Sequence, residues 1–179
     1  MRFGRRGRSQ SALDVSFNPT VPLAQLRDLS MLGFIDAGEA VILHGPVGVG
    51  RSMIARALGM PHTGGADSVV FVKSSRLLAD LSGGHLDRSF PHFLRHWARP
   101  AIRIRDDLVM RDFSLSQADD LYELITERAH KSAICIAKRA ASDWYSLFPN
   151  PVVAESVLDR VVNSAQDVRI DGRSYRPSQ

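Results

Sequence analysis

The chain has 179 residues, 44% of them hydrophobic, and its 23 basic and 19 acidic residues give a formal net charge of +4. This size and composition fit one globular domain with a sizeable core. No apolar run approaches the ~20 residues of a membrane helix, and no hydrophobic stretch of a secretory signal follows the basic start. We therefore expect a cytoplasmic protein with no membrane contact.

Charge, cysteine and histidine content narrow the possibilities further. The positive excess fits a polyanionic partner such as nucleic acid, and it fits ordinary solubility charge equally well. The lone Cys135, inside the apolar run 133–137, is predicted to be a buried thiol, as in a reducing compartment. The six histidines lack the paired spacing of metal ligands, so the sequence does not support a metal centre of that kind.

The first half of the chain is predicted to alternate between helices and strands. The Arg-rich residues 1–12 are expected to be disordered, and residues 13–177 to form a single domain. Pro22 opens a predicted helix over 23–35, whose apolar residues recur at every third position. A strand ending near residue 43 is expected next, and then a helix from residue 52 that is broken by Pro61, Gly64 and Gly65. A strand over 68–73 follows. The next predicted helix, over 76–81, is capped by Ser74 or Ser75 and ended by Gly83 and Gly84.

The second half continues this alternation. A weaker helix is predicted within 87–98, followed by a strand over 100–105, a helix after the capping residues 114–116 and a strand over 132–137. A short turn or helix is then predicted over 142–148, closed by Pro149 and Pro151. A helix over about 154–164 and a terminal hairpin that turns at Asp171 and Gly172 complete the prediction. Strands that alternate with helices predict an α/β fold, in which helices cover both faces of a mainly parallel sheet.

Residues 40–52, AVILHGPVGVGRS, hold the most informative motif. An apolar strand, a loop with three glycines and the start of a helix follow one another, as in the phosphate-binding P-loop G-x-x-x-x-G-K-[ST]. Glycines allow backbone N–H groups to turn toward phosphate oxygens, and the helix N-terminus adds positive potential. A glycine-rich turn without a ligand is the alternative, and the flanking strand and helix favour the phosphate loop.

One position of the motif is altered, because Arg51 stands where the lysine is expected. Lysine acts there as a compact ammonium group, whereas arginine is a wide planar fork that prefers bidentate contacts, so the exchange is not conservative. Ser52 keeps the hydroxyl that the motif uses as a Mg²⁺ ligand. We therefore expect weakened nucleotide binding and strongly impaired hydrolysis.

A second motif lies about 55 residues further on. Asp106 and Asp107 directly follow a predicted strand, where a nucleoside triphosphatase needs carboxylates to orient Mg²⁺ and the attacking water. A solvated turn would explain the same pair of residues. Together with the loop, the first interpretation is favoured, and Ser52 and Asp106 are the candidate metal ligands.

Over residues 13–177 the chain resembles the IstB-like ATP-binding proteins, which are AAA+ P-loop ATPases similar to the helicase loader DnaC and which help insertion sequences to transpose. The resemblance rests on the loop motif and on several other stretches: residues 32–39 (LGFIDAGE), 75–81 (SRLLADL), 117–128 (QADDLYELITER), 143–149 (DWYSLFP), 151–160 (PVVAESVLDR) and 172–176 (GRSYR).

This resemblance implies that ATP and Mg²⁺ are held between subunits that assemble on DNA and assist a transposase. The residues that it implies for the phosphates are Gly45, Pro46, Gly48, Gly50, Arg51 and Ser52. It implies the Walker B roles for Asp106 and Asp107, and an arginine-finger role for Arg160, which otherwise would be interpreted as an ordinary surface charge on a helix.

Three departures from the family pattern affect the predicted activity. Arg51 replaces the loop lysine, and Lys138 replaces the Asn that the family usually carries after its fourth strand. A lysine can touch a phosphate as a point charge, but it cannot accept a hydrogen bond from water. Arg103 and Arg105 interrupt the strand before Asp106, which predicts either a distorted strand or acidic or water partners for these side chains.

The leading hypothesis is an ATP-binding helper of an insertion-sequence transposase that assembles on DNA, with hydrolysis weak or absent. Its expected partners are DNA, contacted mainly at phosphates, the transposase and further copies of the chain. The alternative is a non-catalytic DNA-binding or assembly module derived from such an ATPase. A different P-loop enzyme, such as a small kinase, is disfavoured because the sequence holds no recognisable signature of a substrate base.

Overall fold

A computed structural model of the protein describes residues 18, 20–59, 69–100, 102–106, 112–128, 131–163 and 165–175. The predictions for segment 1–12, for the break at Pro61, Gly64 and Gly65, and for Asp107 lie outside these residues. So do the predictions for the side chains of Arg103, Arg105 and Asp106. Within the described part of the chain, no helix is both long and apolar enough to cross a membrane.

Five strands within the described residues form one parallel sheet in the order β2-β3-β4-β1-β5. They are β1 (Ala40–His44), β2 (Val69–Lys73), β3 (Ile102–Asp106), β4 (Ala133–Ala137) and β5 (Gln166–Arg169). β1 pairs with β4 on one side and with β5 on the other. Because all the pairings are parallel, the carboxyl ends of the strands share one edge of the sheet.

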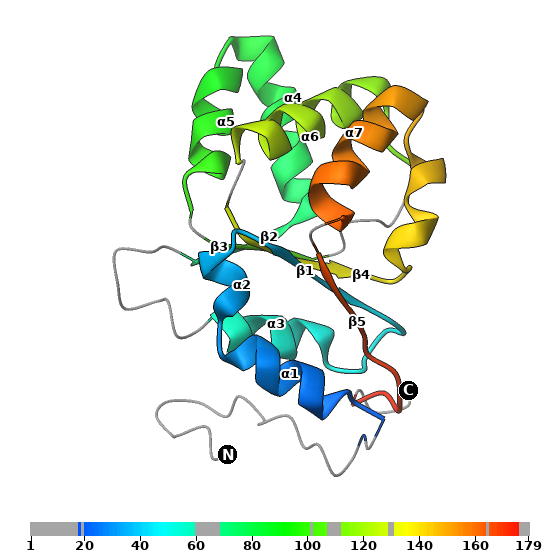
Figure 1. The fold of residues 1–179 in the computed structure, drawn as a ribbon. Coiled ribbons are helices and arrows are strands. Elements are labelled where there is room, and N and C mark those ends of the chain that lie inside the picture. Colours follow the sequence, from blue (N-terminus) through cyan, green and yellow to red (C-terminus); the bar gives the residue numbers. More distant parts are fainter. Residues whose placement is uncertain are drawn as a thin grey trace.

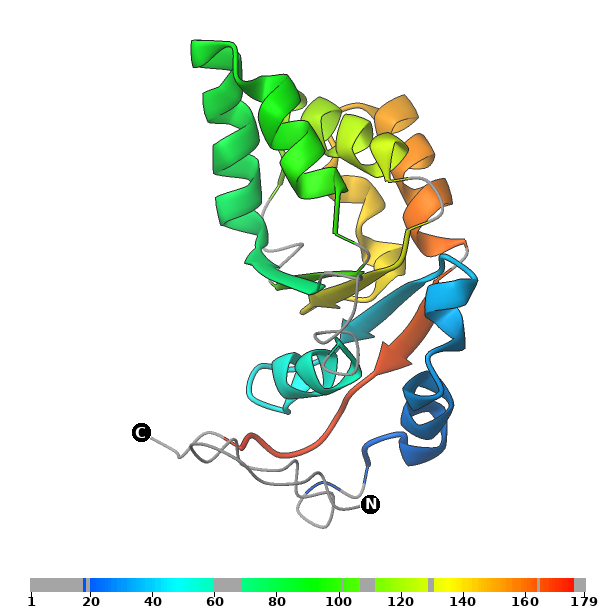
Figure 2. The ribbon, with the colours of Figure 1, turned by 90° about the vertical axis from the view of Figure 1, so that its left-hand side faces the viewer.

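Helices cover both faces of this sheet, as predicted (Figures 1 and 2). On one side lie α1 (Leu23–Ser30), α2 (Gly33–Asp36) and α3 (Arg51–Gly59). On the other lie α4 (Ser74–Asp87), α5 (Phe90–Ala98), α6 (Leu115–Glu127) and α7 (Pro151–Val162). Short 3₁₀ turns, η2 (Ala141–Asp143) and η3 (Tyr145–Leu147), connect β4 to α7.

The strand side chains alternate between two cores. Val41, Leu43, Ile134 and Ile136 enter the cluster beneath α1 and α3. Ile42, Cys135 and Ala137 enter the cluster beneath α6 and α7, which confirms the buried thiol. All five residues of β1 are buried, as expected for a strand covered on both faces.

The single helix predicted over 23–35 is divided in two. Leu32 adopts the left-handed conformation, with φ of 65°, and separates α1 from α2. This turn lets Phe34 enter the core, where it is 2% exposed, and its carbonyl accepts a hydrogen bond of 3.0 Å from Ser132 Oγ. Burial of one aromatic ring thus overrides the local helical period.

The prediction that Gly83 and Gly84 end a helix is wrong, because α4 runs through both to Asp87. Helix α5 packs against α4, and a Cβ on Gly84 would lie 2.7 Å from backbone atoms of Phe90. Gly84 therefore serves close packing between two helices and not termination. In the connection between α4 and α5, the Asp87 carboxylate accepts hydrogen bonds from the hydroxyl and the amide of Ser89. These hydrogen bonds hold the pKa of Asp87 below its ordinary value.

Two predictions for the last third also need correction. Pro151 does not close the preceding turn but is the first residue of α7. Its missing N–H loses no hydrogen bond there, because the first N–H groups of a helix have no partner within the helix. Asn150 Oδ1 caps the helix by accepting a hydrogen bond from Val152 N at 2.9 Å. The predicted terminal hairpin does not form, since β5 pairs in parallel with β1 and the chain past Gly172 continues beside the loop after β1. The helix after Ser114 is confirmed, with a complete capping box to Gln117.

The adjacent glycines of α4 provide a matched test of this packing. Gly83→Ala, with nothing within 4 Å of the new methyl group, should stabilise the protein by roughly 1 kcal/mol through helix propensity. Gly84→Ala should destabilise it by about 1–2 kcal/mol, because the methyl group overlaps the α5 backbone. Urea unfolding of both variants measures the difference. Equal stabilisation by both changes would contradict the close α4–α5 contact.

Candidate functional site

The loop between β1 and α3 has the backbone conformation that only glycines readily adopt. Gly45, Gly48 and Gly50 have φ angles of 141°, 88° and 96°, all in the left-handed range. The loop leaves the carboxyl end of the fully buried β1 and enters α3 at Arg51. A winding glycine loop that opens a helix at a sheet edge suits an anionic ligand such as phosphate.

Arg51, at the altered lysine position, is turned into the protein. The residue is 8% exposed, and its Nη1 donates a hydrogen bond to the backbone oxygen of Ala137, the last residue of β4. This bond ties the start of α3 to the carboxyl end of the strand beside β1. A guanidinium group engaged with this carbonyl differs from an ammonium group directed at phosphates.

Apart from Arg160, the other predicted site residues with a described backbone lie at the same edge of the sheet as the loop or at the start of α3. Ser52 is the second residue of α3 and is half-buried, and Pro46 is exposed at the start of the loop. Asp106 is the last residue of β3, at the same sheet edge as the loop. Because β4 lies between β3 and β1, Asp106 and His44 stand two strand spacings apart, roughly 10 Å.

Arg160 is not brought to this loop within one chain. It is exposed on α7, its guanidinium carbon lies 5.2 Å from the centre of the Tyr122 ring, and its Nη1 donates to Ser156 O at 3.1 Å. These contacts hold the side chain against α6 and α7. An exposed position is compatible with the predicted finger role only toward a second molecule.

Residues 170–175, which we call the C-terminal clasp, lie along the loop. Ile170 N donates to His44 O at 2.8 Å, and Tyr175 N donates to Gly48 O at 2.9 Å. A Cβ on Gly48 would overlap Ser174, and one on Gly45 would overlap the backbone of Ile170. These two glycines are thus needed for the approach of the clasp as well as for the turn of the loop.

The clasp is held in turn by the segment before α1. Asn18 is 1% exposed; its Oδ1 accepts from Arg173 N at 2.6 Å and its Nδ2 donates to Arg173 O at 2.9 Å. Thr20 Oγ1 donates to Asp171 O at 3.1 Å. Sequence reasoning missed Asn18, because its partner is 155 positions away and no local pattern marks the pair.

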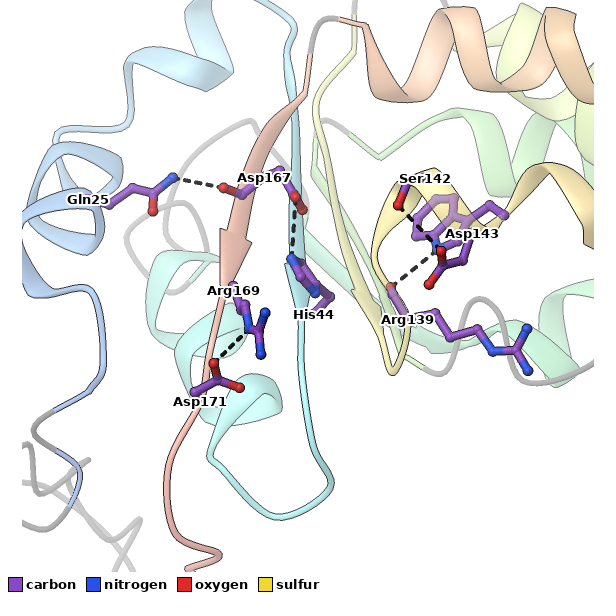
Figure 3. Close-up of polar contacts among 9 residues, drawn as sticks. Gln25, His44, Arg139, Ser142, Asp143, Asp167, Arg169 and Asp171 are labelled. Atoms are coloured by element: carbon purple, nitrogen blue, oxygen red, sulfur yellow. Dashed lines mark hydrogen bonds and ion pairs between the residues drawn. The ribbon is translucent and has the colours of Figure 1, made fainter.

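A polar pair also joins β1 to β5 just before the loop (Figure 3). His44 Nε2 lies 3.3 Å from Asp167 Oδ2, and Gln25 Nε2 donates to Asp167 O at 2.9 Å. Figure 3 shows the His44 side chain directed toward β5, away from β4. α1, β5 and β1 are therefore connected at the entrance to the loop.

Removal of the Asn18 side chain tests the link between the clasp and the preceding segment. Asn18→Ala should lower the free energy of unfolding by about 1–3 kcal/mol, because it removes two partly buried hydrogen bonds to the backbone of Arg173. Thr20→Ala is the matched control, since this exposed residue makes one long hydrogen bond, and it should cost under ~1 kcal/mol. Chemical unfolding gives both values. Similar losses in the two variants would count against a specific role of Asn18.

Comparison with known proteins agrees with this geometry. The family model of the IstB-like ATP binding protein matches residues 5–179. An insertion-sequence ATP-binding protein of Mycobacterium tuberculosis is 51% identical over 166 residues, which cover 92% of this chain and 66% of that protein. The ATP-binding protein of insertion sequence IS21 from Pseudomonas aeruginosa is 29% identical, with coverage of 91% and 62%. The chain thus spans about two thirds of the length of these relatives.

Solved structures show the same fold. The DnaC helicase loader matches with a TM-score of 0.72 at 20% identity, over 90% of this chain and 97% of that chain. The replication initiator DnaA bound to AMPPCP and single-stranded DNA matches with a TM-score of 0.72 at 12% identity, over 93% and 51%. The P-loop AAA+ fold predicted from the sequence is therefore confirmed, and the chain belongs to the family of IstB-like ATP binding proteins.

Proposed function

We propose that this protein binds ATP at the loop between β1 and α3 and acts as a DNA-associated helper of an insertion-sequence transposase, with weak hydrolysis. The observation that carries the proposal is the loop itself. Three glycines in the left-handed range wind from a buried strand into the N-terminus of α3, which is the backbone arrangement that accepts a phosphate chain.

The residues that would hold the nucleotide are those of the loop and of the first turn of α3. The backbone of Gly45, Gly48 and Gly50 would surround the phosphates, with Pro46 at the rim. Mg²⁺, when bound, would neutralise phosphate charge, and Ser52 is placed to contact it. Asp106 is the further candidate metal ligand, and Asp107 the candidate for orienting water.

Weak hydrolysis follows from Arg51. Its guanidinium group donates to Ala137 O, so the loop does not offer the compact ammonium that normally reaches the β- and γ-phosphates. Without that cation, the charge that develops on the transferred phosphoryl group is poorly stabilised. The backbone of the binding loop is thus better preserved than the positive charge that hydrolysis needs.

Restoration of the lysine tests this account. Arg51→Lys should raise the rate of ATP hydrolysis at least tenfold, because the shorter side chain releases Ala137 O and presents an ammonium to the phosphates. Arg56→Lys, in the same helix but exposed over the Phe71 ring, is the matched control and should leave the rate unchanged. Phosphate release is the measurement. Equal rates for the original chain and Arg51→Lys would refute the proposed cause.

DNA association is supported by a basic face on α5. His92, Arg95, His96 and Arg99 are all exposed and follow one another at helical spacing. The opposite face of α5 packs Trp97 and Ala98 into the core with α4, and α5 contains no acidic residue. Exposed arginines and histidines along one helix are suited to phosphate contacts, which give affinity without base specificity.

The salt dependence of DNA binding tests this face. The double variant Arg95→Ala with Arg99→Ala should weaken binding to a fluorescent 20-base-pair duplex and reduce the salt slope by about 0.9 per lost phosphate contact. Arg76→Ala removes an exposed arginine of α4 that lies 3.4 Å from Asp80, and it serves as control with little expected effect. Fluorescence anisotropy at several salt concentrations measures the slope. Identical slopes for the double variant and the control would exclude α5 as the contact.

A non-catalytic DNA-binding or assembly module is the second candidate, and the engagement of Arg51 by β4 favours it. In that case DNA affinity would not respond to ATP.

The transposase and further copies of the chain are proposed as partners through the insertion-sequence relatives, of whose length the chain covers about two thirds. In an assembly of several copies, the exposed Arg160 would reach the nucleotide of a neighbouring copy.

A further inference from the structure

The clasp, residues 170–175, contacts the glycine loop through two backbone hydrogen bonds. Ile170 N donates to His44 O directly before the loop, and Tyr175 N donates to Gly48 O within it. Figure 1 shows the chain after β5 running beside this loop. We propose that the clasp is a positioning element of the nucleotide site: it turns a loop amide toward the phosphates, and bound ATP in turn stabilises the clasp. This inference rests on the proposed binding of ATP by the loop.

The bond from Tyr175 sets the direction of the peptide group between Gly48 and Val49. The described residues contain no cis peptide bond, and in a planar trans peptide the C=O and the following N–H point in opposite directions. Gly48 O faces the clasp, because it accepts from Tyr175 N. The N–H of Val49 therefore points away from the clasp.

The side of the loop away from the clasp is the one that a phosphate can reach. A Cβ on Gly48 would overlap Ser174, and one on Gly45 would overlap the backbone of Ile170, so the clasp fills the near side. A phosphate chain on the opposite side would meet the N–H of Val49, and successive loop N–H groups are the donors that bind such anions. The clasp thereby directs a donor of the loop at the ligand.

This peptide group needs a restraint because glycine leaves it free to rotate. Gly48 has a φ of 88° and no side chain to pack, whereas the Val49 side chain is anchored in the cluster beneath α1 and α3 at 1% exposure. Without the clasp, only the permissive backbone of Gly48 would set the direction of the Val49 N–H. A donor that is already held in its bound orientation need not be ordered when the ligand arrives, which favours binding.

Two residues hold the clasp in place, and within the described part of the chain neither makes a hydrogen bond to residues 45–50. Asn18 accepts from Arg173 N at 2.6 Å and donates to Arg173 O at 2.9 Å. Gly172 has a φ of 122°, and a Cβ there would overlap the side chains of Asn18 and Thr20. Asn18 and Gly172 are therefore positioning residues, which act on the loop through the clasp.

The coupling between clasp and ligand acts in both directions. The factor by which a docked clasp raises the affinity for ATP is also the factor by which bound ATP favours the docked clasp. Two clasp amides report this docking: that of Tyr175, bonded to Gly48 O, and that of Arg173, bonded to Asn18 Oδ1. Both should exchange more slowly with solvent deuterium when Mg-ATP is bound, as resolved by NMR of the original chain.

Calorimetric titration of the full chain with Mg-ATP and with Mg-tripolyphosphate tests the positioning role. Asn18→Ala and Gly172→Ala should each weaken both ligands by about fivefold or more, and by the same factor, because the lost contact is to phosphate. Gly84→Ala, which loses stability at the remote contact between α4 and α5, is the matched control and should leave both affinities within about twofold. Thermal unfolding sets a temperature at which every variant is folded.

The outcomes separate this inference from the proposed function. Folded Asn18→Ala and Gly172→Ala variants that bind both ligands as tightly as the original chain would overturn the role of the clasp and leave ATP binding by the loop intact. A loss for ATP without a loss for tripolyphosphate, an equal loss in Gly84→Ala, or unchanged exchange at Tyr175 and Arg173 would overturn it too. Failure of the original chain to bind ATP would overturn the proposed function and this inference together.

Discussion

The site depends on the pairing of β1 with strands on both sides. β4 and β5 hold β1 in the sheet, and every residue of β1 is buried, so the loop that follows is anchored at its first residue. The same pairing brings three distant parts of the chain to one edge: the loop, the end of β4 and the start of the clasp. A parallel sheet collects the carboxyl ends of its strands in this way, and ligand sites of α/β proteins lie there.

The exchange of lysine for arginine changes what the first residue of α3 does. A buried guanidinium group needs hydrogen-bond acceptors, and the carbonyl that ends β4 supplies one. Arg51 therefore joins a helix to a strand, while the exposed Lys138 follows the end of that strand.

Much of this fold was predictable because its signals are local. The apolar runs 41–43 and 133–137 indicate buried strands, and the glycines at 45, 48 and 50 indicate a loop with left-handed residues. The capping box at Ser114 is a signal of the same kind. Each of these features depends on residues within a few positions of one another, so periodicity and turn chemistry suffice to find them.

The features that escaped prediction depend on distant partners. Leu32 breaks a helical pattern because Phe34 has a place in the core, and Gly84 stays helical because α5 needs room. The partner of Arg51 is 86 positions away, and β5 joins β1 where a local turn signal at Gly172 suggested a hairpin. Tertiary contacts override local preference at each of these positions, and one sequence does not show which distant residue will provide the contact.

The attachment of Asn18 to Arg173 has a consequence for how the molecule is made. The chain emerges from the ribosome from its N-terminus, and 155 positions separate these two residues. Contacts of such long sequence separation tend to form late, because closing the long intervening segment costs entropy before the contact can contribute stability. The glycine loop is therefore synthesised early, but a nascent chain can form the clasp contacts that brace this loop only when translation has passed Tyr175.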